Sequence, residues 1–220
     1  MYQYLLFDLD GTLFDTSEGV LRSVQYALGK MGEPVPEMEA LRCFIGPPLV
    51  EIFSAFCGFS REEAERATAF YRERYAVTGV LEVKPYPGIV ELFRELDVAG
   101  YVIAVATGKP AVYSRQILAA HGLEAHVRAL VTPELDGRRS EKREIIGCIL
   151  DELGVSADER DRVVMVGDRK FDIIGAHEAG VDAIGVSYGF APEGELEACG
   201  CTHLVDSVDG LRRLLLEGEA

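Results

Sequence analysis

Hydrophobic residues change their spacing near residue 85, and this change divides the chain into two kinds of sequence. Between residues 15 and 84, apolar positions recur every three to four residues, as in amphipathic helices, and no long strand is indicated. Helices are expected there at 16–31, 37–44, 49–56 and 60–75. Ser60-Arg61-Glu62-Glu63 has the spacing of a capping box, which would open the last of them. We therefore expect an all-helical insert.

After the turn signal Pro85-Tyr86-Pro87-Gly88, short apolar runs alternate with helical spacings. The runs predict strands at 101–106, 129–131, 163–166, 183–186 and 204–205. Helices are expected around them at 89–99, 111–120, 140–153, 171–179 and 207–216. Strands that alternate with helices pair in parallel and carry helices on both faces of the sheet. The sequence thus predicts an α/β fold, a Rossmann-like doubly wound parallel sheet formed by residues 1–14 and 85–220, into which residues 15–84 are inserted.

The first predicted strand, Leu5–Leu9, contains one carboxylate and is followed by a second. Asp8 and Asp10 are two positions apart, so on a strand their side chains would leave the same face. Burying an unpaired charge is costly unless a partner or a metal ion compensates it. We therefore expect the strand to end here, before Gly11, and to present both carboxylates at a site.

Two further predicted strands end in polar, turn-forming residues, Thr107-Gly108-Lys109 and Gly167-Asp168-Arg169. In open α/β sheets, ligands bind at the carboxyl ends of the strands. Asp168 would complete, with the first two carboxylates, an all-oxygen site of the kind that Mg²⁺ prefers. The Thr107 hydroxyl and nearby backbone N–H groups suit a phosphate oxygen, with a simple helix N-cap as the alternative.

Lys142 and Asp172 stand near the starts of two predicted helices. A cation at Lys142 opposes the helix dipole, which favours negative groups at that end. Lys142 therefore suggests an anionic partner, with a solvated surface lysine as the alternative. Asp172 follows Asp168 by four residues. It could be a surface carboxylate that complements the helix dipole. The functional alternative is that it supports a metal site, as a brace or as an additional ligand. Ser140 is the candidate N-cap of the helix that contains Lys142.

The chain is acidic, with 22 Lys and Arg residues against 37 Asp and Glu residues and a net charge of -15. This balance argues against a nucleic-acid polymer or an anionic membrane as partner. A small anionic substrate would need local positive charge from a bound cation and a few basic side chains. No apolar run approaches the roughly 18 residues of a membrane span, and the first strand starts too early for a signal peptide. With five scattered cysteines, which suit a reducing compartment, we expect a cytoplasmic protein.

Together these motifs resemble those of the haloacid dehalogenase superfamily, on its phosphatase side. Asp8-Leu9-Asp10-Gly11-Thr12-Leu13 looks like the first motif, and Gly167-Asp168-Arg169-Lys170-Phe171-Asp172 resembles the fourth. Thr107 and Lys142 match the residues of the second and third motifs. The resemblance covers nearly the whole chain, because the helical segment 15–84 lies where the family carries its first type of cap domain.

The resemblance implies hydrolysis in two steps. Asp8 would attack phosphorus and form an aspartyl-phosphate, while Asp10 would protonate the leaving oxygen and later take a proton from water. Mg²⁺ would be held by Asp8, the backbone carbonyl of Asp10 and Asp168, with Asp172 as support. Asp10 also separates this chain from the true dehalogenases, which resemble it in fold but lack the second aspartate.

The same resemblance implies how the substrate is held. Thr107, Gly108 and Lys142 would bind the phosphoryl oxygens and spread the charge of the transition state. The helical cap would close over the phosphate and contact the leaving group, as lids often do. Arg42 and Gly46 are possible substrate-binding residues of the cap, although helix packing and turn chemistry are the alternative explanation.

Lys109, just after the second motif, is a further possible substrate-binding residue. Gly46-Pro47-Pro48-Leu49 and residues 136–142 and 167–176 are similar to a branch that contains phosphoglycolate phosphatases and 5′-nucleotidases. We expect a monomer or homodimer that acts on a small phosphorylated metabolite, with neither a nucleic-acid polymer nor a membrane as partner. The alternatives are a phosphomutase of the β-phosphoglucomutase type and a non-catalytic phosphate-binding module.

Overall fold

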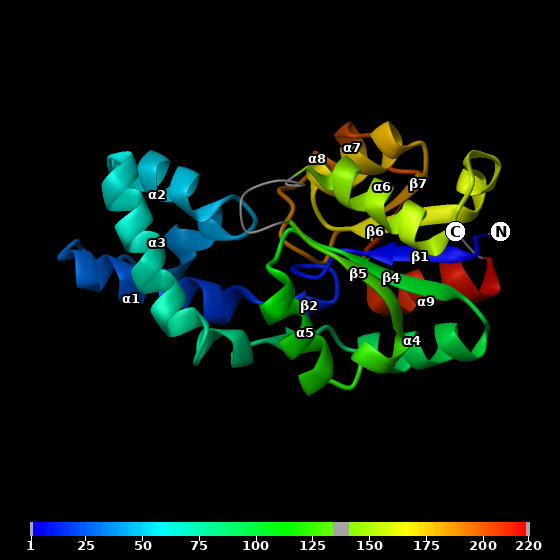
Figure 1. Ribbon diagram of the computed structural model, residues 1–220, viewed down its shortest axis with the longest axis horizontal. Coiled ribbons are helices and arrows are strands. Elements are labelled where there is room, and N and C mark those ends of the chain that lie inside the picture. The colour runs from blue at the N-terminus through cyan, green and yellow to red at the C-terminus, as the bar shows by residue number, and fades with distance from the viewer. Residues whose placement is uncertain (1, 134–140, 219–220) are drawn as a thin grey trace. The chain divides into compact units, whose positions relative to one another are not determined.

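The computed structural model describes residues 2–133 and 141–218, and the chain forms two compact units. One unit comprises Met1–Asp15 and Pro85–Ala220, and the other comprises Thr16–Lys84. The short strands β2 (Phe14–Asp15) and β3 (Lys84–Pro85) lie along the two passages of the chain between the units (Figure 1).

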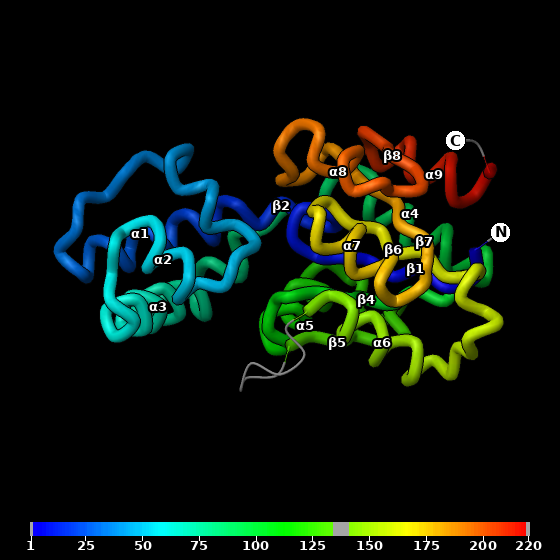
Figure 2. Tube along the Cα trace, turned by 90° about the horizontal axis from the view of Figure 1, so that it is seen from above, coloured from blue at the N-terminus to red at the C-terminus, as the bar shows by residue number. Residues whose placement is uncertain are grey.

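The first unit is built on a six-stranded sheet with the order β5-β4-β1-β6-β7-β8 (Figure 2). Its strands are β1 (Tyr4–Phe7), β4 (Val102–Ala106), β5 (Val127–Val131), β6 (Val163–Gly167), β7 (Asp182–Val186) and β8 (His203–Val205). All neighbouring strands pair in parallel, and each predicted strand is present, so the predicted α/β fold is confirmed. The strand order reverses at β1, which makes its carboxyl end the expected ligand-binding crevice.

The strand β1 ends at Phe7, two residues before the end that the sequence predicted. The Asp8 N–H still donates to Val166 O at 2.9 Å, as a continuation of the sheet. The chain then turns at Gly11, whose φ of 89° is a conformation that glycine adopts without strain. The prediction that Asp8 and Asp10 share one face of a strand is therefore wrong, because β1 ends at Phe7 and the chain bends at Leu9, between the two aspartates.

Helices cover both faces of the sheet. One face carries α6 (Lys142–Leu153) and α7 (Lys170–Ala179), and the other carries α4 (Ile89–Val98) and α9 (Val208–Glu217) (Figure 1). The unit also contains α5 (Ala111–Ala120), α8 (Glu195–Ala198) and the 3-10 helices η3 (Glu124–His126) and η4 (Ala157–Arg162). Successive residues of β1 point to opposite faces, because Leu6 lies in the buried cluster with Ile146 and Ile173, whereas the Phe7 ring lies 5.0 Å from that of Phe93.

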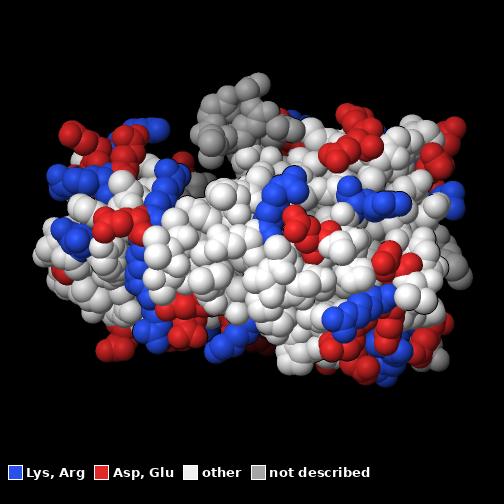
Figure 3. Space-filling view, turned by 60° about the horizontal axis from the view of Figure 1, so that its bottom comes forward, with Lys and Arg blue, Asp and Glu red and all other residues white. Residues whose placement is uncertain are grey.

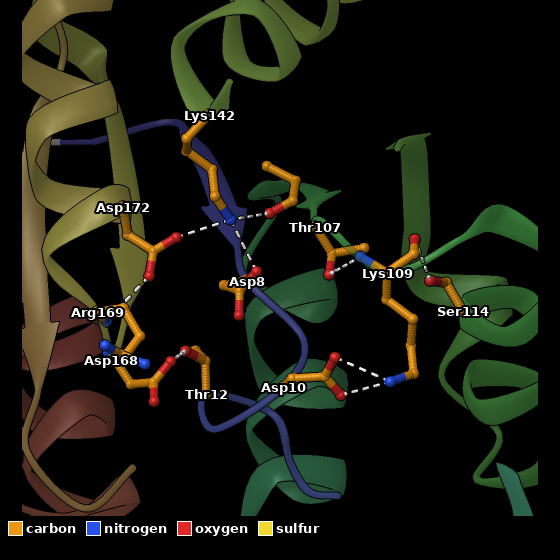
Figure 4. Close-up of polar contacts among 11 residues, drawn as sticks. Asp8, Asp10, Thr12, Thr107, Lys109, Ser114, Lys142, Asp168, Arg169 and Asp172 are labelled. Carbon is orange, nitrogen blue, oxygen red and sulfur yellow. Dashed lines mark hydrogen bonds and ion pairs between the residues drawn. The ribbon is translucent and has the colours of Figure 1, made fainter. Parts of the chain in front are cut away.

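The helix predicted from Ser140 begins at Lys142, with Glu141 as its N-cap and a capping box that involves Glu144. Ser140, and residues 136–139 of the segment compared with the phosphatase branch, lie outside the described residues. Lys142 is therefore the first residue of α6, at the end of the helix that faces the carboxyl edge of the sheet (Figure 4).

The second unit shows no strand between Thr16 and Val83. Its helices are α1 (Ser17–Met31), η1 (Met38–Phe44), α2 (Leu49–Cys57), α3 (Arg61–Tyr75) and η2 (Gly79–Leu81). The predicted capping box is present, since Ser60 N donates to Glu63 Oε2 at 2.9 Å and Glu63 N donates to Ser60 Oγ at 3.3 Å. Across the described part of the whole chain, none of the helices combines the length and apolar character that a membrane span requires.

Candidate active site

Three strand ends meet at the middle of the carboxyl edge of the sheet. Asp8 follows β1, Thr107 follows β4 and Asp168 follows β6, and β1 is hydrogen-bonded to both of the other strands. Because parallel strands end at the same edge, these three polar side chains lie close together (Figure 4). The structure therefore brings together the three strand ends that the sequence singled out, and their role as a site stays a prediction.

Lys142 joins two of the carboxylates from the start of α6. Its ammonium lies 2.7 Å from Asp8 Oδ1 and 2.7 Å from Asp172 Oδ1, and it donates to Ala106 O at 2.8 Å. Gly175 on α7 permits this close approach, because a Cβ there would lie 2.7 Å from that of Lys142. The Lys142 side chain is only 10% exposed. A solvated lysine and a surface carboxylate, the alternatives for Lys142 and Asp172, are both wrong.

Asp168 is fully buried next to this ion-pair network. Its Oδ2 accepts a hydrogen bond from Phe190 N at 2.7 Å, and Thr12 Oγ1 donates to its Oδ1 at 3.4 Å. Carboxylate oxygens of Asp8, Asp168 and Asp172 lie within 4.8 Å of one another. Three carboxylates this close repel one another, and a divalent cation with oxygen ligands offsets that repulsion. The donor set therefore fits Mg²⁺.

Burial changes the ionisation of this cluster. It raises the pKa of Asp8 to about 7; Lys142 opposes this rise and Asp172 adds to it. Burial, followed by the charges of Asp8 and Asp172, also raises the pKa of Asp168 well above its usual value. For Lys142, burial acts to lower the pKa, but the neighbouring carboxylates outweigh it and raise the pKa. Asp8 and Asp168 thus bind protons more tightly than exposed aspartates do, as expected where further positive charge is needed.

Asp10 lies in a different polar network. Lys109 Nζ is 2.8 Å from each of its two carboxylate oxygens. The Lys109 side chain is 6% exposed and that of Asp10 is 25% exposed, so this pair borders solvent more closely than the Asp8 network does. The structure thus brings Lys109, predicted as a possible substrate-binding residue, to a carboxylate of the first motif.

Thr107 is buried at the end of β4 and is not a helix N-cap. Its hydroxyl accepts a hydrogen bond from Lys109 N at 3.2 Å, and the following helix α5 has Pro110 at its N-cap position. Gly108 lies between Thr107 and Lys109, and a Cβ added to it would have no neighbour within 4 Å. Thr107 and Gly108 therefore remain the predicted phosphate-binding groups at this strand end.

The segment after β7 contributes groups that the sequence did not indicate. The Tyr188 hydroxyl donates to Thr12 O at 3.1 Å. Glu195, the first residue of α8, accepts from Arg169 Nε at 2.9 Å and from Lys170 N at 3.0 Å. β7 lies beside β6 in the sheet, so the available signal was the glycine- and proline-containing run that follows the predicted strand, Ser187-Tyr188-Gly189-Phe190-Ala191-Pro192.

Arg42 and Gly46 belong to the second unit. Arg42 lies in η1, with its guanidinium 3.6 Å from the Glu39 carboxylate. Gly46 has a φ of 105°, so the turn that it forms favours glycine. A contribution of these two residues to substrate binding stays a prediction.

Similarity to known proteins covers both units. A family described as haloacid dehalogenase-like hydrolase matches residues 5–186, a range that includes every motif at the carboxyl edge of the sheet. A 5′-nucleotidase from Pseudomonas aeruginosa is 43% identical over 97% of this chain and 96% of its own length. The tyrosine-protein kinase PtkA from Mycobacterium tuberculosis is 34% identical over 97% of this chain and 72% of its own.

A phosphoglycolate phosphatase from Cupriavidus necator is 30% identical over 96% of this chain and 92% of its own length. Among solved structures, one described as a predicted phosphatase from Clostridium acetobutylicum superimposes with a TM-score of 0.89 at 40% identity, covering 99% of both chains.

Proposed function

This chain belongs to the haloacid dehalogenase-like hydrolase family, and we propose that it is a magnesium-dependent phosphomonoesterase acting through an aspartyl-phosphate. As a family member with phosphatases among its relatives, it is a hydrolase of phosphoric monoesters. The proposal of magnesium dependence and an aspartyl-phosphate rests on the surroundings of Asp8. This carboxylate is buried at the end of the central strand, bound by Lys142 and clustered with two other carboxylates. Burying a carboxylate beside two others is costly, and such an arrangement is typical of sites where the carboxylate has a chemical role.

In the proposed first step, Asp8 attacks the phosphorus in line with the leaving oxygen. A bond forms between a carboxylate oxygen and phosphorus, and the bond from phosphorus to the leaving oxygen breaks. Lys142, at 2.7 Å from Asp8 Oδ1, fixes the orientation of this carboxylate. Thr107, Gly108 and Lys142 hold the phosphoryl oxygens and stabilise the charge that spreads over them.

Asp10 is the proposed general acid and base. It gives a proton to the leaving oxygen in the first step, and it takes one from the water that cleaves the aspartyl-phosphate in the second. Lys109 binds both oxygens of Asp10, so it orients the carboxylate and must release one oxygen when that oxygen carries the proton.

The proposed cation site consists of Asp8, Asp168 and the backbone carbonyl of Asp10. Asp172 supports it through Lys142, and its Oδ2 accepts a hydrogen bond from Arg169 N at 3.0 Å, which fixes the loop that carries Asp168. A bound Mg²⁺ would reduce the repulsion between the Asp8 carboxylate and the phosphate. The mutual proximity of the three carboxylates supports this assignment.

The division of labour between the two units is also a proposal. Residues 1–14 and 85–220 form the hydrolase core, and residues 15–84 act as a cap that contacts the leaving group, with Arg42 and Gly46 as candidate contacts. We propose a substrate of the size of a nucleoside monophosphate or phosphoglycolate, because relatives named 5′-nucleotidase and phosphoglycolate phosphatase match nearly the whole chain.

A phosphate-release screen tests the function directly. The panel contains nucleoside monophosphates, phosphoglycolate, sugar phosphates and pyrophosphate, each with Mg²⁺ and with excess chelator. We expect release that needs Mg²⁺ and that disappears in Asp8→Asn. Preference for nucleoside monophosphates supports the nucleotidase branch, whereas preference for phosphoglycolate contradicts it.

The same screen separates the alternative functions. A phosphomutase would convert one sugar phosphate into its isomer with little net phosphate release, which chromatography of the products detects. A non-catalytic module would bind phosphate without turnover of any panel member. Phosphoryl transfer is common to the hydrolase and the mutase, so Asp8→Asn abolishes both, and the product decides between them.

The expected partners and location complete the proposal. Acidic and basic side chains lie interspersed on the face shown in Figure 3, and the net charge is -15, which disfavours a nucleic-acid polymer. All five cysteines are free, as suits the proposed cytoplasmic location. We propose a monomer or homodimer, which light scattering after size-exclusion chromatography would distinguish.

A further inference from the structure

We propose that Tyr188, Gly189 and Phe190, here termed the brace segment, position Asp168 and thereby set the affinity of the protein for its divalent cation. The inference rests on the proposed cation site. The brace segment follows β7 and lies outside the motifs that suggested the site, and its contacts reach both loops that carry the candidate ligands.

The first contact holds Asp168 directly. Phe190 N donates to Asp168 Oδ2 at 2.7 Å, whereas the Thr12 hydroxyl lies 3.4 Å from Oδ1. A short backbone hydrogen bond restricts the rotation of a fully buried carboxylate. Oδ1 has the longer contact, so it is the oxygen that Asp168 can present to a cation while Oδ2 stays anchored.

The second contact is a close approach that only glycine allows. A Cβ at Gly189 would overlap Asp168 Cβ and the carbonyl oxygen of Gly11. A Cβ at Gly11 would in turn overlap Asp168 Oδ2, and it would lie 2.7 Å from a ring carbon of Phe190. Asp168 is therefore enclosed between the brace segment and the turn after β1, with no room for an added methyl group on either side.

The third contact fastens the brace segment to the loop after β1. The Tyr188 hydroxyl donates to Thr12 O at 3.1 Å, and its ring meets that of Tyr86 edge-on at 4.8 Å. Burial raises the pKa of Tyr188, so the hydroxyl remains a hydrogen-bond donor. Tyr188 thus connects the loop of Asp8 and Asp10 to the segment that anchors Asp168.

These contacts fix the distance between ligands that come from two different loops. Mg²⁺ requires near-ideal octahedral geometry at short distances, so its affinity is sensitive to small displacements of its ligands. Groups that orient metal ligands typically contribute about 10- to 100-fold to metal affinity. The brace segment is therefore a positioning element rather than a set of ligands.

The test uses two matched pairs of variants. Tyr188→Phe is compared with Tyr101→Phe, because the Tyr101 hydroxyl likewise donates to a backbone carbonyl, that of Leu215, away from the site. Gly189→Ala is compared with Gly147→Ala on α6, where an added Cβ would have no neighbour within 4 Å. Mg²⁺ affinity is measured by calorimetry on metal-free, substrate-free protein, and stability by thermal unfolding in chelator.

We expect Gly189→Ala to weaken Mg²⁺ binding about 10- to 100-fold, and Tyr188→Phe to weaken it about fivefold, the equivalent of one hydrogen bond. Tyr101→Phe and Gly147→Ala should leave the affinity unchanged. The Mg²⁺ concentration that half-saturates phosphate release should rise by the same factors, with activity largely restored at saturating Mg²⁺.

Unchanged affinity in Tyr188→Phe, with a loss of stability equal to that of Tyr101→Phe, would show a purely structural role and overturn the inference. This comparison decides the matter even if Gly189→Ala does not fold. Wild-type protein that binds Mg²⁺ but releases no phosphate from any substrate would contradict the proposed function and leave the affinity comparison valid. Wild-type protein that binds no Mg²⁺ would overturn the inference itself.

Discussion

Asp8 and Asp10 are two residues apart, yet their surroundings differ in charge and in burial. Asp8 is enclosed with two other carboxylates and Lys142, and its pKa is raised to about 7. Asp10 is a quarter exposed and is bound through both oxygens by Lys109. Identical side chains can therefore serve as nucleophile and as proton carrier when distant elements supply different partners.

The largest expected effect is that of Asp8→Asn. Loss of the nucleophile should lower kcat by about 10⁴-fold or more, as found for catalytic groups that act as a unit. The measurement is phosphate release at saturating Mg²⁺, with circular dichroism to establish that the variant folds. Retention of a tenth of the activity would remove Asp8 from its proposed role.

Asp10→Asn should have a smaller effect that depends on the leaving group. Loss of general acid–base catalysis costs about 10²- to 10⁴-fold with an alkyl phosphate, whose leaving oxygen needs a proton. With p-nitrophenyl phosphate, whose leaving group departs as an anion, the first step should be nearly normal and a burst of nitrophenol should appear. Equal losses with both substrates in the burst phase would show that Asp10 does not protonate the leaving oxygen.

The two lysines should differ in their effect on stability. Lys142→Met leaves Asp8 and Asp172 without their buried partner, and breaking such a pair costs about 3–5 kcal/mol of unfolding free energy. Lys109→Met affects a carboxylate that is partly exposed, so the cost should be nearer 1–2 kcal/mol. Urea unfolding in the presence of a chelator measures the unfolding free energy of both variants. A larger loss of unfolding free energy for Lys109→Met than for Lys142→Met would contradict the comparison.

The smallest effect concerns pH and the cation. Because the pKa of Asp8 is raised above its value in the unfolded chain, its protonation favours the folded state, and metal-free protein should lose stability as pH rises from about 4 to 7. Mg²⁺ competes with that proton, so the increase in Tm that Mg²⁺ produces should grow over this range and level off above pH 7. At a hundredfold excess over Kd, the increase should reach about 5–10 °C.

Asp8→Asn provides the control for this titration, because an amide carries no competing proton. Its Mg²⁺-dependent change in Tm should be smaller and should vary less with pH than that of the wild type. A wild-type change in Tm that is independent of pH would contradict the assignment of Asp8 to the cation site.

The sequence predicted the sheet because its central strands are continuous apolar runs. The strand predicted at 163–166 is present as β6, Val163–Gly167, and the residue that follows it is Asp168, as expected. The first strand was less well predicted, because its apolar run continues to Leu9, past the point at which the chain leaves the sheet. Where a strand ends depends on the turn that follows, here one with a positive φ at Gly11.

The partners of the site residues were harder to predict than the residues themselves. The pairing of Lys109 with Asp10 joins positions 99 residues apart, and no local pattern encodes it. The anchor on Asp168 is the backbone N–H of Phe190, a group that every residue except proline carries. Gly189 acts through the absence of a side chain, so its role becomes visible only when its neighbours are placed around it.

The most direct test of the central claim is to trap the covalent intermediate. Asp10→Asn should slow the second step, so phosphoenzyme should accumulate when this variant is mixed with p-nitrophenyl phosphate and quenched in acid. Peptide mass spectrometry is predicted to find one phosphoryl group on Asp8, and none in the variant that also carries Asp8→Asn. Phosphate on another residue, or turnover with no phosphoenzyme at any time, would contradict the assignment of Asp8 as the nucleophile.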